Sequence, residues 1–340
     1  MRSIVTSLAL VLGIGCGMDF RPPSLVPRAR LVGVRVEIAG APERAAPLPG
    51  ETFDAAPIVL ANDGASPLTT AWFACGLLPS RTGVPSCAGG PLASGDAVLG
   101  SAPTMRVFVP ADLPARGVFS ILFAIASCDE GAVPVLPEDT TGLPSCAGGG
   151  PDARAELSVF TVPIATDPAL ANRHPDLSDE AITLTAPDGS ERPWSVPSGA
   201  PGPDGCALLP DDDALPHLAL PVAPEGMELD PDLLTFAFSI TSTPDDRERY
   251  VELLPGNEPP REAREVLQIS HYLTAGTFER QFSAFEGLDD SVGPSSVDWD
   301  LPAVEDVPEG GLLVRFWWVA RDLRGGMAVT ERRLCVVPAG

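Results

Sequence analysis

The sequence contains no lysine: all 22 basic residues among its 340 are arginines. This absence excludes chemistry that needs an ε-amine, including the P-loop lysine, the Schiff-base lysine and the Ser-x-x-Lys acyl-enzyme motif. Positive charge is also scarce, because the formal net charge is -24. Binding to nucleic acid draws much of its affinity from cations that neutralise phosphates. The composition therefore predicts no nucleic-acid partner.

Aromatic residues make up only 6% of the chain, whereas it holds 33 glycines and 39 prolines. Glycine and proline at this density interrupt regular structure, which favours short strands over long helices. The hydrophobic fraction of 44% is still sufficient for buried cores. At about 100 to 200 residues per domain, the chain is long enough for two domains.

The longest apolar run near the amino terminus covers residues 4–15 and follows the positive Arg2. A transmembrane helix needs about 20 apolar residues, whereas the apolar region of a secretory signal needs only about 7 to 15. The pattern therefore predicts a signal peptide over residues 1–15.

The signal ends in Leu-Gly-Ile-Gly-Cys at residues 12–16, which resembles a bacterial lipoprotein signal, although Gly13 stands where that family prefers leucine. The resemblance implies that Cys16 is alkylated with diacylglycerol, that the peptide is cut before it, and that its new amino group is acylated. Gly17 in place of aspartate after the cysteine implies the outer membrane, facing the periplasm or the cell surface. Proline-containing residues 16–30 would then be the lipidated cysteine and its tether. The alternative is an ordinary secretory signal that leaves Cys16 as a free or paired thiol.

Six further cysteines remain in a chain predicted to be exported, so disulfides are expected. They are Cys75, Cys87, Cys128, Cys146, Cys206 and Cys335. Residues 82–90 and 141–149 agree at eight of nine positions around a cysteine, and each follows an apolar segment that ends in a cysteine. This repeat favours Cys75–Cys87, Cys128–Cys146 and Cys206–Cys335. The alternative pairing joins Cys75 to Cys128 and Cys87 to Cys146. A zinc site is the functional alternative, but the sequence has no Cys-x-x-Cys motif.

Residues 31–165 show short apolar segments between turn signals, which predicts a β-sandwich. In residues 32–38 apolar side chains alternate with Gly33, Arg35 and Glu37, the period of a half-buried strand. We expect Trp72 to lie in the core of this domain. The other predicted strands are 58–61, 68–75, 106–109, 118–127 and 155–162.

Residues 166–340 predict a second β-sandwich with a long loop over 187–232. Two glycines within residues 322–326 indicate a hairpin. The run Phe316, Trp317 and Trp318 indicates a strand buried on both faces or packed against its neighbour. The other predicted strands are 181–186, 217–222, 233–241, 249–254, 266–273 and 277–285, with 312–321 and 327–337 flanking the hairpin.

The fold class predicted is therefore all-β, and the pattern resembles bacterial immunoglobulin-like domains of surface lipoproteins. The resemblance rests on residues 49–52 before an apolar run, Trp72 preceding Cys75, residues 274–278, and the terminal hairpin of residues 321–326. It implies two tandem immunoglobulin-like sandwiches that serve as a binding or spacer module.

No catalytic motif stands out. His174, His217 and His271 are far apart in the sequence, and neither a Gly-x-Ser-x-Gly elbow nor a His-Glu-x-x-His motif is present. We interpret all three histidines as structural or surface residues. The sequence therefore predicts a protein that is not an enzyme, with an extracytoplasmic hydrolase on a β-sandwich scaffold as the alternative.

Acidic residues are concentrated in the second predicted domain. Residues 31–165 hold 13 acids and 6 arginines, a net charge of -7, whereas residues 166–340 hold 32 acids and 12 arginines, a net charge of -20. We predict no cofactor, with structural Ca²⁺ as the alternative, because carboxylates are ligands that Ca²⁺ prefers. The candidate ligands are Asp211, Asp212, Asp213, Asp289, Asp290, Asp298, Asp300, Glu305 and Asp306.

Together these features predict a non-catalytic, lipid-anchored envelope or surface protein that acts as a binding or spacer module, or as an accessory subunit of an envelope complex. The predicted partners are the membrane, through the lipid anchor, and an envelope protein or carbohydrate. An exposed aromatic patch around Trp194 or Tyr250 would favour contact with carbohydrate or protein.

Overall fold

The protein is described by a computed structural model. It covers residues 23–62, 67–78, 86–88, 90–99, 104–136, 143–168, 171–177, 182–192, 205–209, 215–222, 230–242, 247–252, 261–286 and 294–338. Within these ranges the regular structure consists of β-strands and short 3-10 helices at Pro114–Arg116, Pro231–Leu234 and Val304–Asp306. None of the helices there is long and apolar enough to cross a membrane. The predicted all-β fold class is confirmed.

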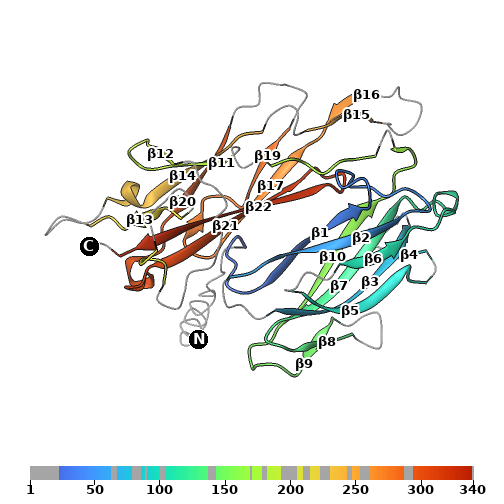
Figure 1. Ribbon diagram of the computed structural model, residues 1–340, viewed down its shortest axis with the longest axis horizontal. Helices are drawn as coiled ribbons and strands as arrows, with labels where there is room; N and C mark the ends of the chain where they lie inside the picture. Colours follow the sequence, from blue (N-terminus) through green and yellow to red (C-terminus); the bar gives the residue numbers. More distant parts are fainter. Residues whose placement is uncertain are drawn as a thin grey trace, which may run out of the picture.

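Two larger sheets form the core of the amino-terminal half (Figure 1). The first has the order β1-β2-β6, with β1 (Arg30–Ile38), β2 (Thr52–Leu60) and β6 (Met105–Phe108). The second has the order β10-β7-β3-β4, with β5 also paired to β3; its strands are β3 (Leu68–Leu78), β4 (Ser86–Cys87), β5 (Ala93–Leu99), β7 (Ser120–Cys128) and β10 (Ala155–Pro163). Both sheets contribute to one core, where the ring of Phe53 lies 6.2 Å from that of Phe123. A core shared by two facing sheets is the arrangement of a β-sandwich.

The sequence of β1 explains its place in this core. Val34, Val36 and Ile38 alternate with charged residues and face the core, as the period of two predicts. Trp72 on β3 differs from the prediction, because it is half-buried and packs against the core from its margin. Its ring lies over Gly95 of β5, where a Cβ would come within 3.3 Å of the indole nitrogen.

The carboxy-terminal half also contains two facing sheets. One has the order β12-β11-β14-β20-β18, with β11 (Ile182–Thr185), β12 (Glu191–Arg192), β14 (Thr235–Ile240), β18 (Thr277–Phe278) and β20 (Ser295–Asp300). The other has the order β13-β22-β21-β17-β19, with β13 (His217–Ala219), β17 (Leu267–Leu273), β19 (Phe282–Phe285), β21 (Leu312–Arg321) and β22 (Met327–Val337). Their shared core is aromatic: the ring of Phe238 lies 5.0 Å from that of Phe316 and 5.2 Å from that of Trp318. Separate two-stranded sheets pair β15 (Arg249–Glu252) with β16 (Arg261–Arg264), and β8 (Val133–Val135) with β9 (Ser145–Ala147).

Two predicted elements differ from the structure. The single strand expected over residues 277–285 is divided, because β18 pairs with β20 in one sheet and β19 pairs with β17 in the other. The loop expected over residues 187–232 contains β12 and β13, and β13 pairs in parallel with β22. The hairpin between β21 and β22 is confirmed, with positive φ angles at Leu323 and Gly325.

Strand β21 is buried on both faces, as the sequence predicts. Phe316 and Trp318 belong to the carboxy-terminal core, and both are fully buried. Trp317 and Val319 point the other way, where they form a second cluster with Val32 of β1. We call the contact of β1 and β2 with β21 and β22 the joint. Apolar packing at the centre of the joint holds the two halves together. At this point both faces of β21 are covered by other parts of the protein.

Hydrogen bonds to backbone atoms surround the apolar centre of the joint. Arg321 donates from Nη2 to the carbonyl of Val32 at 2.8 Å, and Arg315 donates from Nη1 to the carbonyl of Ala61 at 2.8 Å. Charge-assisted hydrogen bonds are stronger than neutral ones, and their geometry restricts the groups they join. The joint is therefore held by packing and by directional bonds.

Residues 23–29, which we call the strap, lie within the segment predicted to be a tether. Leu25 forms a parallel bridge with Leu273 of β17, and the amide of Val26 donates to the carbonyl of Leu273 at 2.8 Å. The chain then enters β1 in the amino-terminal half. The strap therefore contacts both halves. Cys16 and the predicted signal peptide lie outside the described residues.

Three disulfides link the six cysteines in the favoured arrangement. They are Cys75–Cys87, Cys128–Cys146 and Cys206–Cys335. The first two connect the ends of β3 and β7 to the two repeated segments, and the third joins the region before β13 to β22. The predicted pairing is confirmed, and the zinc alternative is not compatible with these bonds.

Candidate functional site

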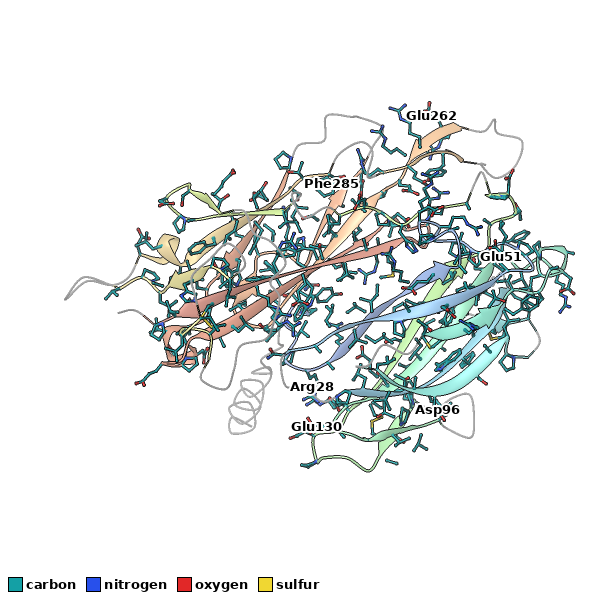
Figure 2. The ribbon with its side chains drawn as sticks, viewed as in Figure 1. Arg28, Glu51, Asp96, Glu130, Glu262 and Phe285 are labelled. Carbon is teal, nitrogen blue, oxygen red and sulfur yellow. A yellow bond between two sulfur atoms is a disulfide. The ribbon has the colours of Figure 1, made fainter. Side chains whose placement is uncertain are left out.

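A cavity of about 620 Å³ opens where the strap reaches the amino-terminal half. This volume lies within the range of about 300 to 1,000 Å³ found for small-molecule sites. The lining residues come from the strap and from the adjoining ends of β1, β3, β7 and β10. They are Leu25, Val26, Pro27, Arg28, Ala29, Arg30, Leu68, Ser127, Asp129, Arg154, Ala155 and Glu156. Figure 2 shows Arg28 and Glu130 at this same end of the molecule. We call it the arginine cavity.

Arg28 is held in a fixed position in this cavity. Its Nη1 donates to Oδ2 of Asp129 at 2.7 Å and to the carbonyl of Asp152 at 3.1 Å. The other carboxylate oxygen of Asp129 accepts the backbone amide of Arg154 at 2.7 Å. Burial opposes ionisation of Asp129, but the hydrogen bonds from Arg154 and Arg28 outweigh it and lower the pKa of the carboxyl group. Asp129 is therefore a charged, fully engaged anchor for Arg28.

Two further arginines line the same cavity. Arg30 donates from Nη1 to the carbonyl of Pro23 at 2.8 Å, and its guanidinium lies 5.8 Å from the ring centroid of Tyr272. Arg154 is exposed, and its side chain has no hydrogen-bond or ion-pair partner among the described residues. Three guanidinium groups thus border one opening in a chain that is strongly acidic as a whole.

A second cavity, of about 480 Å³, lies on the other side of Leu25 and differs in charge. Its lining contains one ionisable side chain, the carboxylate of Asp306, and no arginine. The strap therefore borders two openings of similar size, and the arginines mark one of them.

His174 and His271 both use their ring nitrogens for contacts within the fold. His174 lies in the joint, where Nε2 is 2.9 Å from the carbonyl of Val36 and Nδ1 accepts the amide of Met327 at 3.1 Å. Burial lowers its pKa. A neutral ring that donates from Nε2 and accepts at Nδ1 satisfies both contacts. His217 begins β13, beside Cys335 of β22.

His271 forms a buried hydrogen-bond chain with two serines. Its Nδ1 lies 3.1 Å from the carbonyl of Arg280, and its Nε2 lies 3.2 Å from Oγ of Ser283, which accepts from Oγ of Ser295 at 2.9 Å. Burial lowers the pKa of His271 to about 4. A backbone carbonyl stands where a catalytic triad has a carboxylate, and His271 and Ser283 do not border either cavity. These hydrogen bonds link β17, β19 and β20.

Two buried carboxylates lie beside the joint. Asp322 accepts Nδ2 of Asn172 at 2.7 Å and the amide of Gly326 at 2.8 Å. Glu265 accepts Nη1 of Arg324 at 2.6 Å, and both carboxylate residues are 2% exposed. Burial, and secondarily the negative charge of Asp322, raise the pKa of Glu265 to about 7. Glu265 therefore titrates near neutral pH.

This raised pKa gives a testable dependence of stability on pH. Because the folded-state pKa of about 7 exceeds the ordinary value of 4.5, the contribution of Glu265 is complete below about pH 4.5 and is lost as pH rises through 7. We expect Glu265→Gln to reduce the decline in the free energy of unfolding between pH 5 and pH 8 by about 2 to 3 kcal/mol. Urea titrations across this range measure it.

Glu262→Gln, three residues earlier on the exposed strand β16, is the matched control, because Glu262 is largely solvated. It should leave the pH dependence unchanged. A Glu265→Gln protein whose stability profile runs parallel to that of the wild type would contradict the expectation.

The remaining predicted site residues are dispersed. Asp298 and Asp300 lie on the exposed side of β20, where Asp300 accepts Oγ1 of Thr235 at 2.8 Å. Glu305 and Asp306 belong to a 3-10 helix. The candidates Asp211, Asp212, Asp213, Asp289 and Asp290 lie outside the described residues. Within those residues no three His, Cys, Asp or Glu side chains are grouped to hold a metal ion.

The predicted aromatic patch is only half visible, because Trp194 lies outside the described residues. Tyr250 is half-buried, and the guanidinium of Arg324 lies 4.2 Å from its ring centroid. A ring face covered in this way is engaged within the chain.

The arginine cavity was not predicted from the sequence. The available signal was the presence of Arg21, Arg28 and Arg30 within a short segment that is poor in acids.

No protein-family model matches the chain, and no curated protein matches it. Among solved structures, red sea bream transglutaminase is 9% identical, over 90% of this chain and 32% of that one, with a TM-score of 0.21. The two tandem V-type regions of a v-region-containing chitin binding protein are 9% identical over 91% and 98%, with a TM-score of 0.24. The three N-terminal domains of the bacteriophage RB49 outer capsid protein Hoc are 10% identical over 91% and 99%, with a TM-score of 0.15. The chain thus spans about a third of the transglutaminase, and TM-scores this low carry no argument about function.

Proposed function

We propose that the protein is a non-catalytic, lipid-anchored component of a bacterial outer membrane, built from two tandem immunoglobulin-like sandwiches that act as a rigid binding module. The ligand would bind in the arginine cavity. The protein would face the periplasm or the cell surface, alone or as an accessory subunit of an envelope complex.

The observation that carries this proposal is the position of the strap. Its contacts with β17 and its entry into β1 tie both halves of the molecule to the segment that follows Cys16. Leu25 is nine positions after Cys16 in the sequence, and this stretch spans at most about 30 Å when extended. A lipid on Cys16 would therefore hold the arginine cavity within about 30 Å of the membrane surface.

Two further features support a binding or spacer role. The joint is packed on Trp317 and closed by hydrogen bonds from Arg315 and Arg321, so the two halves would be presented in one fixed arrangement. His174 and His271 direct both ring nitrogens to partners within the fold. Both histidines therefore make structural contacts.

The anchor can be tested by expressing the full chain in a Gram-negative bacterium and measuring the mass of its amino-terminal peptide. We expect a peptide that begins at Cys16 and carries diacylglycerol and an amide-linked acyl chain, in a protein that fractionates with the outer membrane. Stable anchoring needs more than one acyl chain, which this modification supplies.

Cys16→Ser is the matched control and should abolish both the lipid mass and the membrane fractionation. A wild-type amino-terminal peptide without lipid would refute the anchor. Recovery of wild-type protein in the soluble periplasmic fraction would do the same.

A further inference from the structure

We propose that the arginine cavity binds a phosphate group carried on an apolar body, as in the headgroup of an anionic phospholipid. The membrane as the source of that phosphate rests on the lipid anchor proposed above. The recognition of phosphate itself rests on the cavity alone.

The three arginines of the cavity have unused hydrogen-bond donors. A guanidinium carries five N–H donors. Arg28 and Arg30 each use only Nη1 in the hydrogen bonds that the structure shows, and the side chain of Arg154 uses none among the described residues. Several N–H groups of the three arginines therefore remain for a ligand. A phosphate, with more free oxygens than a carboxylate, can engage more of them, and arginine matches its geometry in bidentate fashion.

Two of the three arginines are ordered by contacts within the chain. Arg28 is fixed by Asp129, which is itself 5% exposed and anchored by the amide of Arg154. Arg30 is fixed by the carbonyl of Pro23 and by the ring of Tyr272. Side chains that are already ordered lose less conformational entropy when a ligand binds. Two of the three guanidinium groups are thus in place before the ligand arrives.

The charged side chains of the lining are mostly positive. The lining contains three arginines and two acids, and both carboxylate oxygens of Asp129 are already occupied. Glu156 at the rim is the remaining acid. At physiological salt the Debye length is about 8 Å, so distant acids of the chain are largely screened from the cavity, whereas Asp152, whose carbonyl contacts Arg28, and Glu130, which follows Asp129, reduce its positive charge. The lining side chains alone sum to a net charge of +1, in a chain whose formal net charge is -24.

The rest of the lining indicates what the phosphate is attached to. Leu25, which is half-buried, and the exposed Pro27 of the strap present a small apolar wall beside the arginines, whereas Val26, Ala29 and Leu68 line the cavity with side chains that are almost entirely buried. A wall of this kind gains free energy by covering apolar ligand surface. A free inorganic phosphate would leave that wall unused, whereas the glycerol and first acyl carbons of a phospholipid would cover it.

The test uses the mature chain with Cys16→Ser, secreted behind an ordinary signal so that it carries no lipid. Calorimetry with monomeric short-chain phosphatidate should show binding, whereas the uncharged diacylglycerol of the same chain length should not bind. We expect Arg154→Gln and Arg30→Gln each to weaken the affinity about tenfold, because each removes a charged hydrogen bond to the ligand. Glu156→Gln should strengthen it.

Arg106→Gln is the matched control, because Arg106 is exposed on β6 and lies outside the cavity lining. It should leave the affinity unchanged. Arg154 is the decisive variant, since its side chain has no partner among the described residues whose loss would disturb the fold. Absence of phosphatidate binding at millimolar concentration, or equal binding by Arg154→Gln and wild type, would overturn the proposal.

The source of the phosphate is tested separately. The same unacylated chain should sediment with phosphatidylcholine vesicles that contain phosphatidic acid and not with pure phosphatidylcholine vesicles. Binding of inorganic phosphate without vesicle binding would overturn the membrane as the source. Because these measurements use a chain without lipid, their outcome is independent of whether Cys16 is acylated in the cell.

Discussion

Replacing Cys206 and Cys335 together with serine is expected to lower the free energy of unfolding of the carboxy-terminal half by about 5 kcal/mol. The two cysteines are fully buried and lie 129 residues apart in the sequence. A cross-link that closes so long a loop removes much of the conformational entropy of the unfolded chain. Urea unfolding followed by the fluorescence of Trp299, Trp317 and Trp318 measures the loss.

The matched control is the double replacement of Cys128 and Cys146, whose sequence separation is only 18. The same reasoning predicts a smaller loss of about 3 kcal/mol. It should be confined to the amino-terminal half. Equal losses for the two pairs, or a Cys206 and Cys335 variant as stable as the wild type, would show that chain entropy is not the main contribution of these bonds.

Trp317→Ala is expected to lower stability by about 3 to 5 kcal/mol, the usual range for truncating a buried tryptophan. The indole fills the centre of the joint, its Nε1 donates to Oε2 of Glu331 at 3.0 Å, and Arg315 lies 5.1 Å from its ring centroid. The loss should weaken the joint and leave the two cores folded. Hydrogen exchange should therefore accelerate at the amide of Met327 on β22, which donates to Nδ1 of His174 in the joint.

Trp318→Ala provides the comparison, because Trp318 is the next residue of the same strand and faces the opposite side. Its indole belongs to the carboxy-terminal core and contacts the ring of Phe238. We expect a loss of similar size, but with faster exchange throughout β14 and β20. Indistinguishable exchange patterns for the two variants would mean that the joint and the core unfold as one unit.

The strands that could be predicted from the sequence are those whose side chains alternate or form long apolar runs. Residues 32–38 and the hairpin around Gly325 were predicted because period and turn chemistry are local properties. Strand β5 was missed: its centre is Ser94, Gly95 and Asp96, which have little strand propensity, and pairing with β3 overrides it.

The division of residues 277–285 could not be predicted either, because it depends on which sheet each short segment joins. Phe278 and Phe285 are both buried in the same core, so the hydrophobic pattern does not distinguish one strand from two. Gly276, with a φ of 83°, lies against Trp299 of β20, where a Cβ would clash. This close approach brings β18 to β20, and only the tertiary structure contains it.

The arginine cavity lay beyond sequence reasoning for a similar cause. Arg28 and Arg154 are 126 positions apart in the sequence, and they meet because β10 begins where β7 ends, beside the strap. The disulfide pairing was easier to predict from the sequence, because the repeated segments around Cys87 and Cys146 each follow an apolar segment that ends in a cysteine.

The position of the strap has a mechanical consequence. The amide of Val26 and the carbonyl of Ser24 both bond to Leu273 of β17, in the half that is more distant in sequence. A pulling force applied at the amino terminus would load these parallel bonds in shear before it reached β1. The carboxy-terminal half would thus hold residues 24–26 of its own chain, and tension at the amino terminus would have to break these bonds before it could unfold the amino-terminal half.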